Sequence, residues 1–112
     1  MSNYPTEEAL RFANMFKALS NPYRLIIFLR LLSCCGTGAG CVPEEQASLF
    51  VGQLGAELTV ASSTVSHHIK ELRQAGMVKM ERRGKNIECS VDGRAVAALA
   101  DLLSGKIPAG LL

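Results

Sequence analysis

Apolar residues recur at helical spacing near the N-terminus of this chain. Four of them follow one another at i, i+3, i+4 and i+7: Ala9, Phe12, Ala13 and Phe16. This spacing predicts a first helix over about residues 7–18, with Thr6 as the hydroxyl cap of its first turn. Three further apolar residues fall outside the stripe: Leu10, Met15 and Leu19. The first helix therefore has more apolar surface than one contact with a core requires.

A second helix is predicted from Pro22 to about Ser33, because Asn21 is a suitable cap and proline is favoured at the first helical position. Its apolar residues lie nearly all round: Leu25, Phe28, Leu29 and Leu32 on one face, with Ile26, Ile27 and Leu31 beside it. A helix of this kind belongs at the centre of a core. Cysteines and glycines then dominate residues 34–41, where no period is present, so a loop is predicted there.

The middle of the chain has the pattern of a helix-turn-helix. Three apolar residues indicate a short third helix: Val51, Leu54 and Leu58. A fourth helix is predicted from about residue 62 to residue 75, and Gly76 suits the left-handed position that often follows a helix. The helix-turn-helix therefore spans about residues 51–76.

A hairpin with a basic tip is predicted next. Two runs with strand character lie on either side of Gly84-Lys85-Asn86, and together they give a two-stranded wing over about residues 77–92. A last helix over about residues 94–104 carries apolar residues on two neighbouring stripes. The tail after Gly105 is expected to be loose.

This order of elements is that of a winged helix-turn-helix. We expect a mainly α fold of about five helices plus the two-stranded wing, in one domain over residues 1–112, because 112 residues are about one domain's worth. Hydrophobic residues make up 48% of the chain and charged residues only 20%. So short a chain has apolar surface to spare. We therefore expect a partner subunit to cover the surplus apolar surface.

The net charge of +2 is unevenly distributed along the chain. Residues 62–85 contain six basic and two acidic residues, a charge of +4, whereas residues 1–61 and residues 86–112 each carry −1. A local block of positive charge gives a small protein a phosphate-binding face without an extreme isoelectric point.

The fourth helix has two chemically distinct faces. Val65, Ile69 and Leu72 form an apolar face, and an opposite polar face is formed by Ser63, His67, Lys70 and Gln74. Short polar side chains with one cation suit insertion into a major groove. The expected DNA contacts on this helix are Ser62, Ser63, Thr64, Ser66, His67 and Lys70. At the hairpin they are Arg82, Arg83 and Lys85, directed at phosphates or a minor groove.

Three segments together resemble the ArsR/SmtB family of winged-helix metalloregulators. They are residues 19–25 (LSNPYRL), residues 60–78 (VASSTVSHHIKELRQAGMV) and residues 83–85 (RGK). The resemblance covers about residues 7–104. It implies a homodimeric repressor whose first and last helices, about residues 7–18 and 94–104, form the dimer interface. It also implies a palindromic double-stranded operator that the protein leaves when an inducer binds.

The metal sites common in that family do not carry over to this chain. The segment that matches the family's thiolate pattern on the third helix is residues 50–55 (FVGQLG), which contains no cysteine. At the start of the last helix Asp92 keeps the aspartate of the family's other common site, but the histidine is replaced. The inducer site is therefore expected elsewhere.

Three cysteines, Cys34, Cys35 and Cys41, stand around a glycine-rich spacer that allows their thiols to converge. Three thiolates suit a soft ion, so trivalent arsenic or antimony is the inducer that we predict at this site. Two alternatives stay open: a dithiol or persulfide redox switch, and thiols without a role. Cys89, in the second wing strand, is interpreted as a small buried hydrophobe, with a ligand role as the alternative.

His67 and His68 are neighbours in the sequence, and their side chains point about 100° apart on a helix. Two such side chains are poorly placed to hold one metal ion together. We therefore interpret His67 as a DNA contact and His68 as a partly packed or flanking residue.

Other functional classes find less support. No spacing of nucleophile and base and no cofactor motif indicates an enzyme, and no cofactor is expected to be required. A winged helix used only for protein contacts is the remaining rival. The chain has no targeting segment and no apolar run long enough for a membrane, so a cytoplasmic protein is expected.

Overall fold

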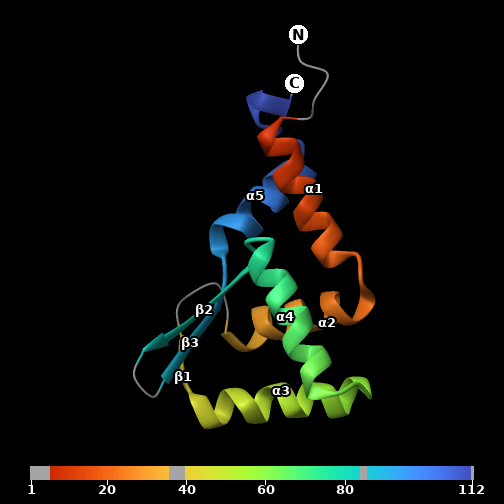
Figure 1. The fold of residues 1–112 in the computed structure, drawn as a ribbon. Coiled ribbons are helices and arrows are strands. Elements are labelled where there is room, and N and C mark those ends of the chain that lie inside the picture. The colour runs from red at the N-terminus through yellow and green to blue at the C-terminus, as the bar shows by residue number, and fades with distance from the viewer. Residues whose placement is uncertain (1–5, 36–39, 84–85, 112) are drawn as a thin grey trace.

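The computed structural model confirms a mainly α winged helix-turn-helix (Figure 1). It describes the backbone of residues 6–35, 40–83 and 86–111, and the side chains of residues 6–33, 51–80 and 91–111. In chain order the elements are α1 (Glu7–Leu19), α2 (Pro22–Cys35), β1 (Gly40–Pro43), α3 (Glu44–Leu58), α4 (Ser62–Gln74), β2 (Val78–Arg83), β3 (Asn86–Val91), α5 (Gly93–Leu103) and the 3-10 helix η1 (Ala109–Leu111).

Helix α1 is capped as predicted, but its buried stripe is not the predicted one. The Thr6 hydroxyl accepts a hydrogen bond from the Ala9 N–H at 3.1 Å. The side chains that enter the core are Phe12, Met15 and Ala18, and Phe16 is exposed. The predicted stripe and the buried stripe overlap, because both contain Phe12. Helix α1 packs against α2 and α4 through the stripe that contains Met15, so that stripe is the buried one. Apolar surface is left over on α1, as the sequence predicts.

Helix α2 is only half buried, so the prediction that it lies at the centre of the core is wrong for one face. Ile27, Phe28 and Leu31 are buried, whereas Leu25 and Leu29 are exposed. The reason is that α4 and β3 both pack against the same side of α2. The other side is left uncovered by the residues that the structure describes.

The sheet has three strands rather than the two of the predicted wing. Strand β1 pairs antiparallel with β3, and β3 pairs antiparallel with β2, which gives the order β1-β3-β2. The predicted loop over residues 34–41 is therefore wrong at its end, where Gly40 and Cys41 begin β1; four residues that include a glycine and a proline show no alternating pattern. They become a strand because β3 offers them an unpaired edge. Helix α3 follows directly from Glu44, earlier than the apolar pattern indicates.

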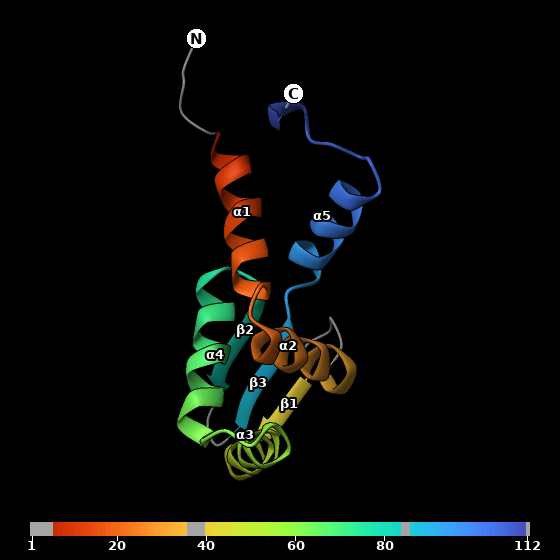
Figure 2. The ribbon, with the colours of Figure 1, turned by 90° about the vertical axis from the view of Figure 1, so that its right-hand side faces the viewer.

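The molecule is elongated, with principal dimensions of 51 × 28 × 23 Å. Figure 2 shows α1 and α5 projecting side by side from one end of the body, while α3 closes the opposite end beneath the sheet and α4. The core lies in the body, where the most deeply buried side chains are Met15, Ile27, Leu31, Leu72, Met77, Val65 and Val91. Among the described residues, no helix is long and apolar enough to cross a membrane.

The C-terminal tail is not loose over residues 105–111, contrary to the prediction. Gly105 turns the chain with a φ of +92°, and η1 packs against α1. Leu111 is partly buried against the core. The pattern of a three-residue helical turn is too short to be recognised in a sequence, and its position depends on the tertiary contact with α1.

The turn between α3 and α4 is tightly packed. The Val60 N–H donates to the Gly55 carbonyl at 2.8 Å, and Thr59 has a φ of 55°, in the left-handed region that β-branched residues rarely occupy. A Cβ atom on Gly55 would lie 2.7 Å from the Val60 carbonyl oxygen. Glycine at this position therefore permits the close approach that sets the angle between the two helices.

Gly55→Ala is expected to lower the free energy of unfolding by about 1–3 kcal/mol, because the added methyl group meets backbone that cannot yield easily. Gly52→Ala is the matched control in the same helix, since a Cβ at Gly52 meets nothing within 4 Å. It is expected to raise stability by about 0.5–1 kcal/mol. Urea unfolding of both variants measures the difference, and equal effects would contradict the role assigned to Gly55.

Candidate nucleic-acid interface

Helix α4 is anchored in the core by the face that the sequence predicts. Val65, Ile69 and Leu72 are all buried. They pack in one cluster with side chains of α1, α2 and α3. The opposite face of the helix is thereby held at a defined angle to the body.

Most of the polar residues of α4 that are predicted to contact DNA are exposed to solvent. Five of the six predicted DNA contacts on this helix are exposed: Ser62, Ser63, Ser66, His67 and Lys70. Thr64 is half-buried. Gln74, at the end of the same face, is also exposed. The exposed face is thus short and polar in its first two turns.

The N-terminus of α4 has no side-chain cap among the described residues. Ala61 occupies the cap position and contributes only its carbonyl, which accepts from the N–H groups of Thr64 and Val65 at 3.0 and 3.1 Å. The positive end of the helix dipole is therefore available to an external acceptor. A phosphate oxygen is the kind of group that such a helix end binds.

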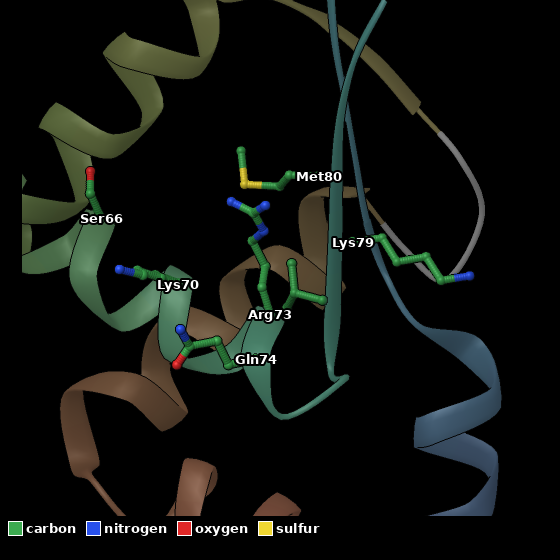
Figure 3. A pocket seen from close by; sticks show the side chains of 7 residues that line it. Ser66, Lys70, Arg73, Gln74, Lys79 and Met80 are labelled. Carbon is green, nitrogen blue, oxygen red and sulfur yellow. The ribbon is translucent and has the colours of Figure 1, made fainter.

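An open groove of about 630 Å³ lies between α4 and β2 (Figure 3). It is lined by Ser66, Lys70, Arg73, Gln74, Val78, Lys79 and Met80. Figure 3 shows the Arg73 side chain directed across the groove toward Met80, and the Lys79 side chain directed to the other side of β2. Three cations therefore line the groove, Lys70, Arg73 and Lys79, and Arg73 is the one whose side chain reaches across it.

Sequence reasoning missed Arg73. The signal was present, because Ser66, Lys70 and Arg73 follow one another at i, i+4 and i+7 and so share one side of the helix. That side faces β2, a neighbour that a helical pattern alone does not reveal.

Lys79 and Asp92 have structural partners. The Lys79 Nζ lies 3.8 Å from the Asp92 Oδ2. The Asp92 Oδ1 accepts from the N–H groups of Arg94 and Ala95 at 2.9 and 3.4 Å and so caps α5. A helix cap therefore accounts for the presence of Asp92.

Two of the three predicted wing contacts lie where β2 ends. Arg82 and Arg83 are the last two residues of β2, and Arg83 is opposite Asn86 in the register. Their side chains, and the whole of Lys85, lie outside the described residues.

His68 is buried, more deeply than predicted, and it links α4 to α2. The Arg24 Nε donates to the His68 Nδ1 at 3.4 Å, and the Arg24 Nη1 donates to the Ala18 carbonyl at 3.4 Å. Burial lowers the pKa of His68 below its usual value of 6.5, and the positive charges of Arg24 and His67 add to the effect, while Glu71 opposes it. The neutral imidazole is therefore the form that fits this position.

His67 differs from its neighbour in both exposure and partner. Its side chain is exposed, and its Nε2 lies 3.8 Å from the Glu71 Oε1 one turn along the helix. The two rings are 6.0 Å apart between centroids. They point to different surroundings, as the sequence predicts.

The cysteines are placed by the backbone alone. Cys34 and Cys35 are the last two residues of α2, and Cys41 is the second residue of β1. Cys89 lies in β3, opposite Gly40 on one side and Met80 on the other. All four side chains lie outside the described residues, so the metal site at Cys34, Cys35 and Cys41 stays a prediction.

Comparison with known families and sequences finds regulators of transcription. The model of the family "Bacterial regulatory protein, arsR family" matches residues 44–80. The uncharacterized HTH-type transcriptional regulator MJ1325 of Methanocaldococcus jannaschii is 35% identical over 89 residues, covering 79% of this chain and 86% of the relative. The uncharacterized HTH-type transcriptional regulator YbzH of Bacillus subtilis is 34% identical over 98 residues, covering 83% and 95%.

Solved structures share the fold. NolR from Sinorhizobium fredii is 24% identical with a TM-score of 0.56, and the match covers 100% of both chains. The transcriptional repressor BigR from Xylella fastidiosa is 26% identical with a TM-score of 0.54, and the match covers 92% of both chains.

The stability of the protein is expected to depend on pH through His68. Because its pKa is lower in the folded than in the unfolded chain, the unfolded chain binds more protons below pH 6.5. The contribution of the neutral His68 to the free energy of unfolding is fully present above about pH 6.5. It is lost as the pH falls through the lowered pKa of the folded protein. The slope cannot exceed one proton, about 1.4 kcal/mol per pH unit.

Thermal unfolding between pH 5 and pH 8 measures this dependence. His68→Gln should flatten the slope, because glutamine can accept from Arg24 but does not titrate. His67→Gln is the matched control at an exposed neighbouring position, and it should keep most of the wild-type slope, because burial and Arg24, the two larger causes of the lowered pKa of His68, remain. If the pH dependence of stability persisted in His68→Gln and disappeared in His67→Gln, the dependence would have to be assigned to His67 instead of His68.

Proposed function

Because this chain belongs to the ArsR/SmtB family of DNA-binding transcriptional regulators, we propose that it is a homodimeric repressor of a palindromic operator, released by a thiol-binding inducer. One observation carries the DNA-binding part of the proposal. Helix α4 buries Val65, Ile69 and Leu72 and presents the opposite polar face beside a groove that contains Lys70 and Arg73.

In the proposed complex the first two turns of α4 enter the major groove. Ser63, Ser66 and His67 are short or planar side chains with donors and acceptors for base edges, and they are exposed together. Lys70 and Arg73 lie farther along the helix, where they would meet phosphates at the groove wall. The uncapped N-terminus of α4 adds a further phosphate contact.

The wing extends the contact to a neighbouring part of the duplex. Arg82, Arg83 and Lys85 form a dense cationic group in the sequence at the hairpin turn. We propose that they bind an adjacent phosphate row or a minor groove. These contacts would contribute affinity with little sequence preference.

Dimerisation through α1 and α5 is supported by the apolar side chains that they leave exposed. Leu10 and Phe16 on α1 are 50% and 42% exposed, and Leu103 on α5 is 74% exposed. An open groove of about 350 Å³ separates the two helices, with Phe12, Ala98 and Ile107 among its lining residues. A two-fold dimer would read two half-sites about 34 Å apart, and a palindrome follows from that symmetry.

We propose that the inducer binds Cys34, Cys35 and Cys41, with trivalent arsenic or antimony as the ion. Its support is the position of these residues at the end of α2 and on β1, at the two ends of one short connection. Helix α2 also contacts α4 and β3. Drawing the connection together around an ion would therefore displace α2 against the recognition helix, and preference for the displaced state would weaken operator binding. A redox or persulfide response of the adjacent Cys34 and Cys35 is the alternative.

Lys70→Ala is expected to weaken binding to DNA from the protein's own promoter region. It should reduce the salt slope of log Kd by about one for each phosphate that the variant leaves unneutralised, because fewer counterions are released. Lys106→Ala, in the C-terminal tail, is the control and should match wild type. Fluorescence anisotropy across a salt series measures both. Weak binding without a salt slope, or no binding at low salt, would favour a winged helix used for protein contacts.

Arsenite or antimonite is expected to release the wild-type protein from the same DNA. The triple variant Cys34→Ser, Cys35→Ser, Cys41→Ser should bind DNA normally and stay bound in arsenite, whereas Cys89→Ser should be released like wild type. Anisotropy with parallel counting of free thiols distinguishes the alternatives. Release of wild type by peroxide or persulfide alone would select the redox alternative, and release of the triple variant by arsenite would exclude the site.

A further inference from the structure

Helix α2 has an apolar face that no described residue of this chain covers. We call it the outer strip; it consists of Tyr23, Leu25, Ile26 and Leu29. Leu29 is 52% exposed, and the other three side chains are 40–44% exposed. Contiguous exposed apolar side chains of this size usually mark a contact with another molecule.

The outer strip lies opposite the face that packs on α4 and β3. Arg30 stands at its edge, and its Nη2 pairs with the Glu57 Oε2 of α3 at 2.8 Å. That ion pair draws the Arg30 guanidinium away from the strip toward α3. The four residues of the strip are themselves uncharged. Its chemistry therefore suits an apolar partner surface rather than nucleic acid or an acidic peptide.

The outer strip continues the apolar surface of α1 around a corner. Phe16 is exposed near the end of α1, and Tyr23 is exposed in the first turn of α2. Only Ser20 and Asn21 separate the two helices, and Figure 2 shows α1 turning directly into α2. The strip is thus adjacent to the surface through which a dimer is proposed.

The surface area that a stable dimer buries favours a second copy of the chain as the partner that covers the outer strip. A stable interface buries about 800 Å² on each partner. A half-exposed large apolar side chain offers roughly 100 Å². Leu10, Phe16, Leu103 and Ile107 are the exposed large apolar residues of α1, α5 and the tail among the described residues. They supply about 400 Å² of the roughly 500 Å² of apolar area that a homodimer interface of this size contains, and the four residues of the outer strip more than supply the remainder.

We infer that the outer strip of α2 is buried by a second copy of this chain, so that the dimer surface extends from α1 and α5 around the corner onto α2. This inference rests on the proposed homodimer and adds a third helix to it. In a two-fold interface the same strip on both protomers is covered at once.

The position of α2 gives this contact a consequence for DNA binding. Ile27, Phe28 and Leu31, on its inner face, belong to the same core cluster as Val65, Ile69 and Leu72 of α4. Helix α2 therefore lies between the partner protomer and the recognition helix. Contact with the partner restrains the layer behind α4, and separation of the two protomers loosens the support of the DNA-binding face.

The test compares three variants with the wild-type chain by sedimentation over a dilution series. Leu25→Glu with Leu29→Glu places two charges in the outer strip and is expected to raise the dimer Kd at least tenfold. Leu103→Glu, on α5, tests the proposed dimer itself. Gln53→Glu adds a charge at an exposed position of α3 and is the control that should dimerise like wild type. Circular dichroism and urea unfolding show whether each variant is folded.

A measurement on the unaltered chain removes the dependence on folding of the variants. Hydroxyl-radical labelling of Leu25, Ile26 and Leu29 is followed at concentrations above and below the dimer Kd. Protection that appears with dimer formation supports the inference. Unchanged labelling, or a strip variant that dimerises like Gln53→Glu while Leu103→Glu does not, would overturn it and leave the dimer standing. A wild-type chain that stays monomeric throughout would overturn both.

Discussion

The structure depends on the two-sided character of α4. Thirteen residues do not form a stable helix in water by themselves, so α4 exists because Val65, Ile69 and Leu72 are buried against the body. The same burial leaves the opposite face exposed, and that face holds the serines, His67 and Lys70 that we propose as DNA contacts. The neighbouring elements have their places relative to this helix: α2 and α3 pack against it, β2 forms the far wall of its groove, and α1 touches its C-terminal half.

A buried histidine and a half-buried arginine join this helix to the rest of the molecule. The neutral imidazole of His68 accepts from Arg24, and the same guanidinium reaches the carbonyl of Ala18. Three helices thus meet at one arginine. Both hydrogen bonds are long, so the junction holds its parts in place without the strength of a charged pair. A junction of this kind can shift when α1 or α4 is displaced.

Much of the fold could be predicted from the sequence, and the failures have physical causes. Periodicity and caps predict the buried face of α4, the exposure of His67 and, to within two residues, the boundaries of every helix except α3 and η1. Four features could not be predicted, because each depends on a neighbour that is distant in the chain. They are the buried stripe of α1, the half burial of α2, the strand at residues 40–43 and the packing of η1. Arg73 was missed for the same reason, since its significance comes from β2. The predicted cysteine site and wing cations depend on side chains outside the described residues.

The bare end of α4 links folding to recognition. With Ala61 in the cap position, the free protein forgoes stabilisation of about 1 kcal/mol that a serine or aspartate would supply there. In the proposed complex a DNA phosphate would accept from the free N–H groups in its place, so the helix would be capped only when DNA is bound. A variant with a capping residue in place of Ala61 would gain thermal stability. Its capping side chain would then have to be displaced before DNA could bind at this helix end. The uncapped end that costs the free protein stability is thus the end at which the proposed DNA contact would restore it.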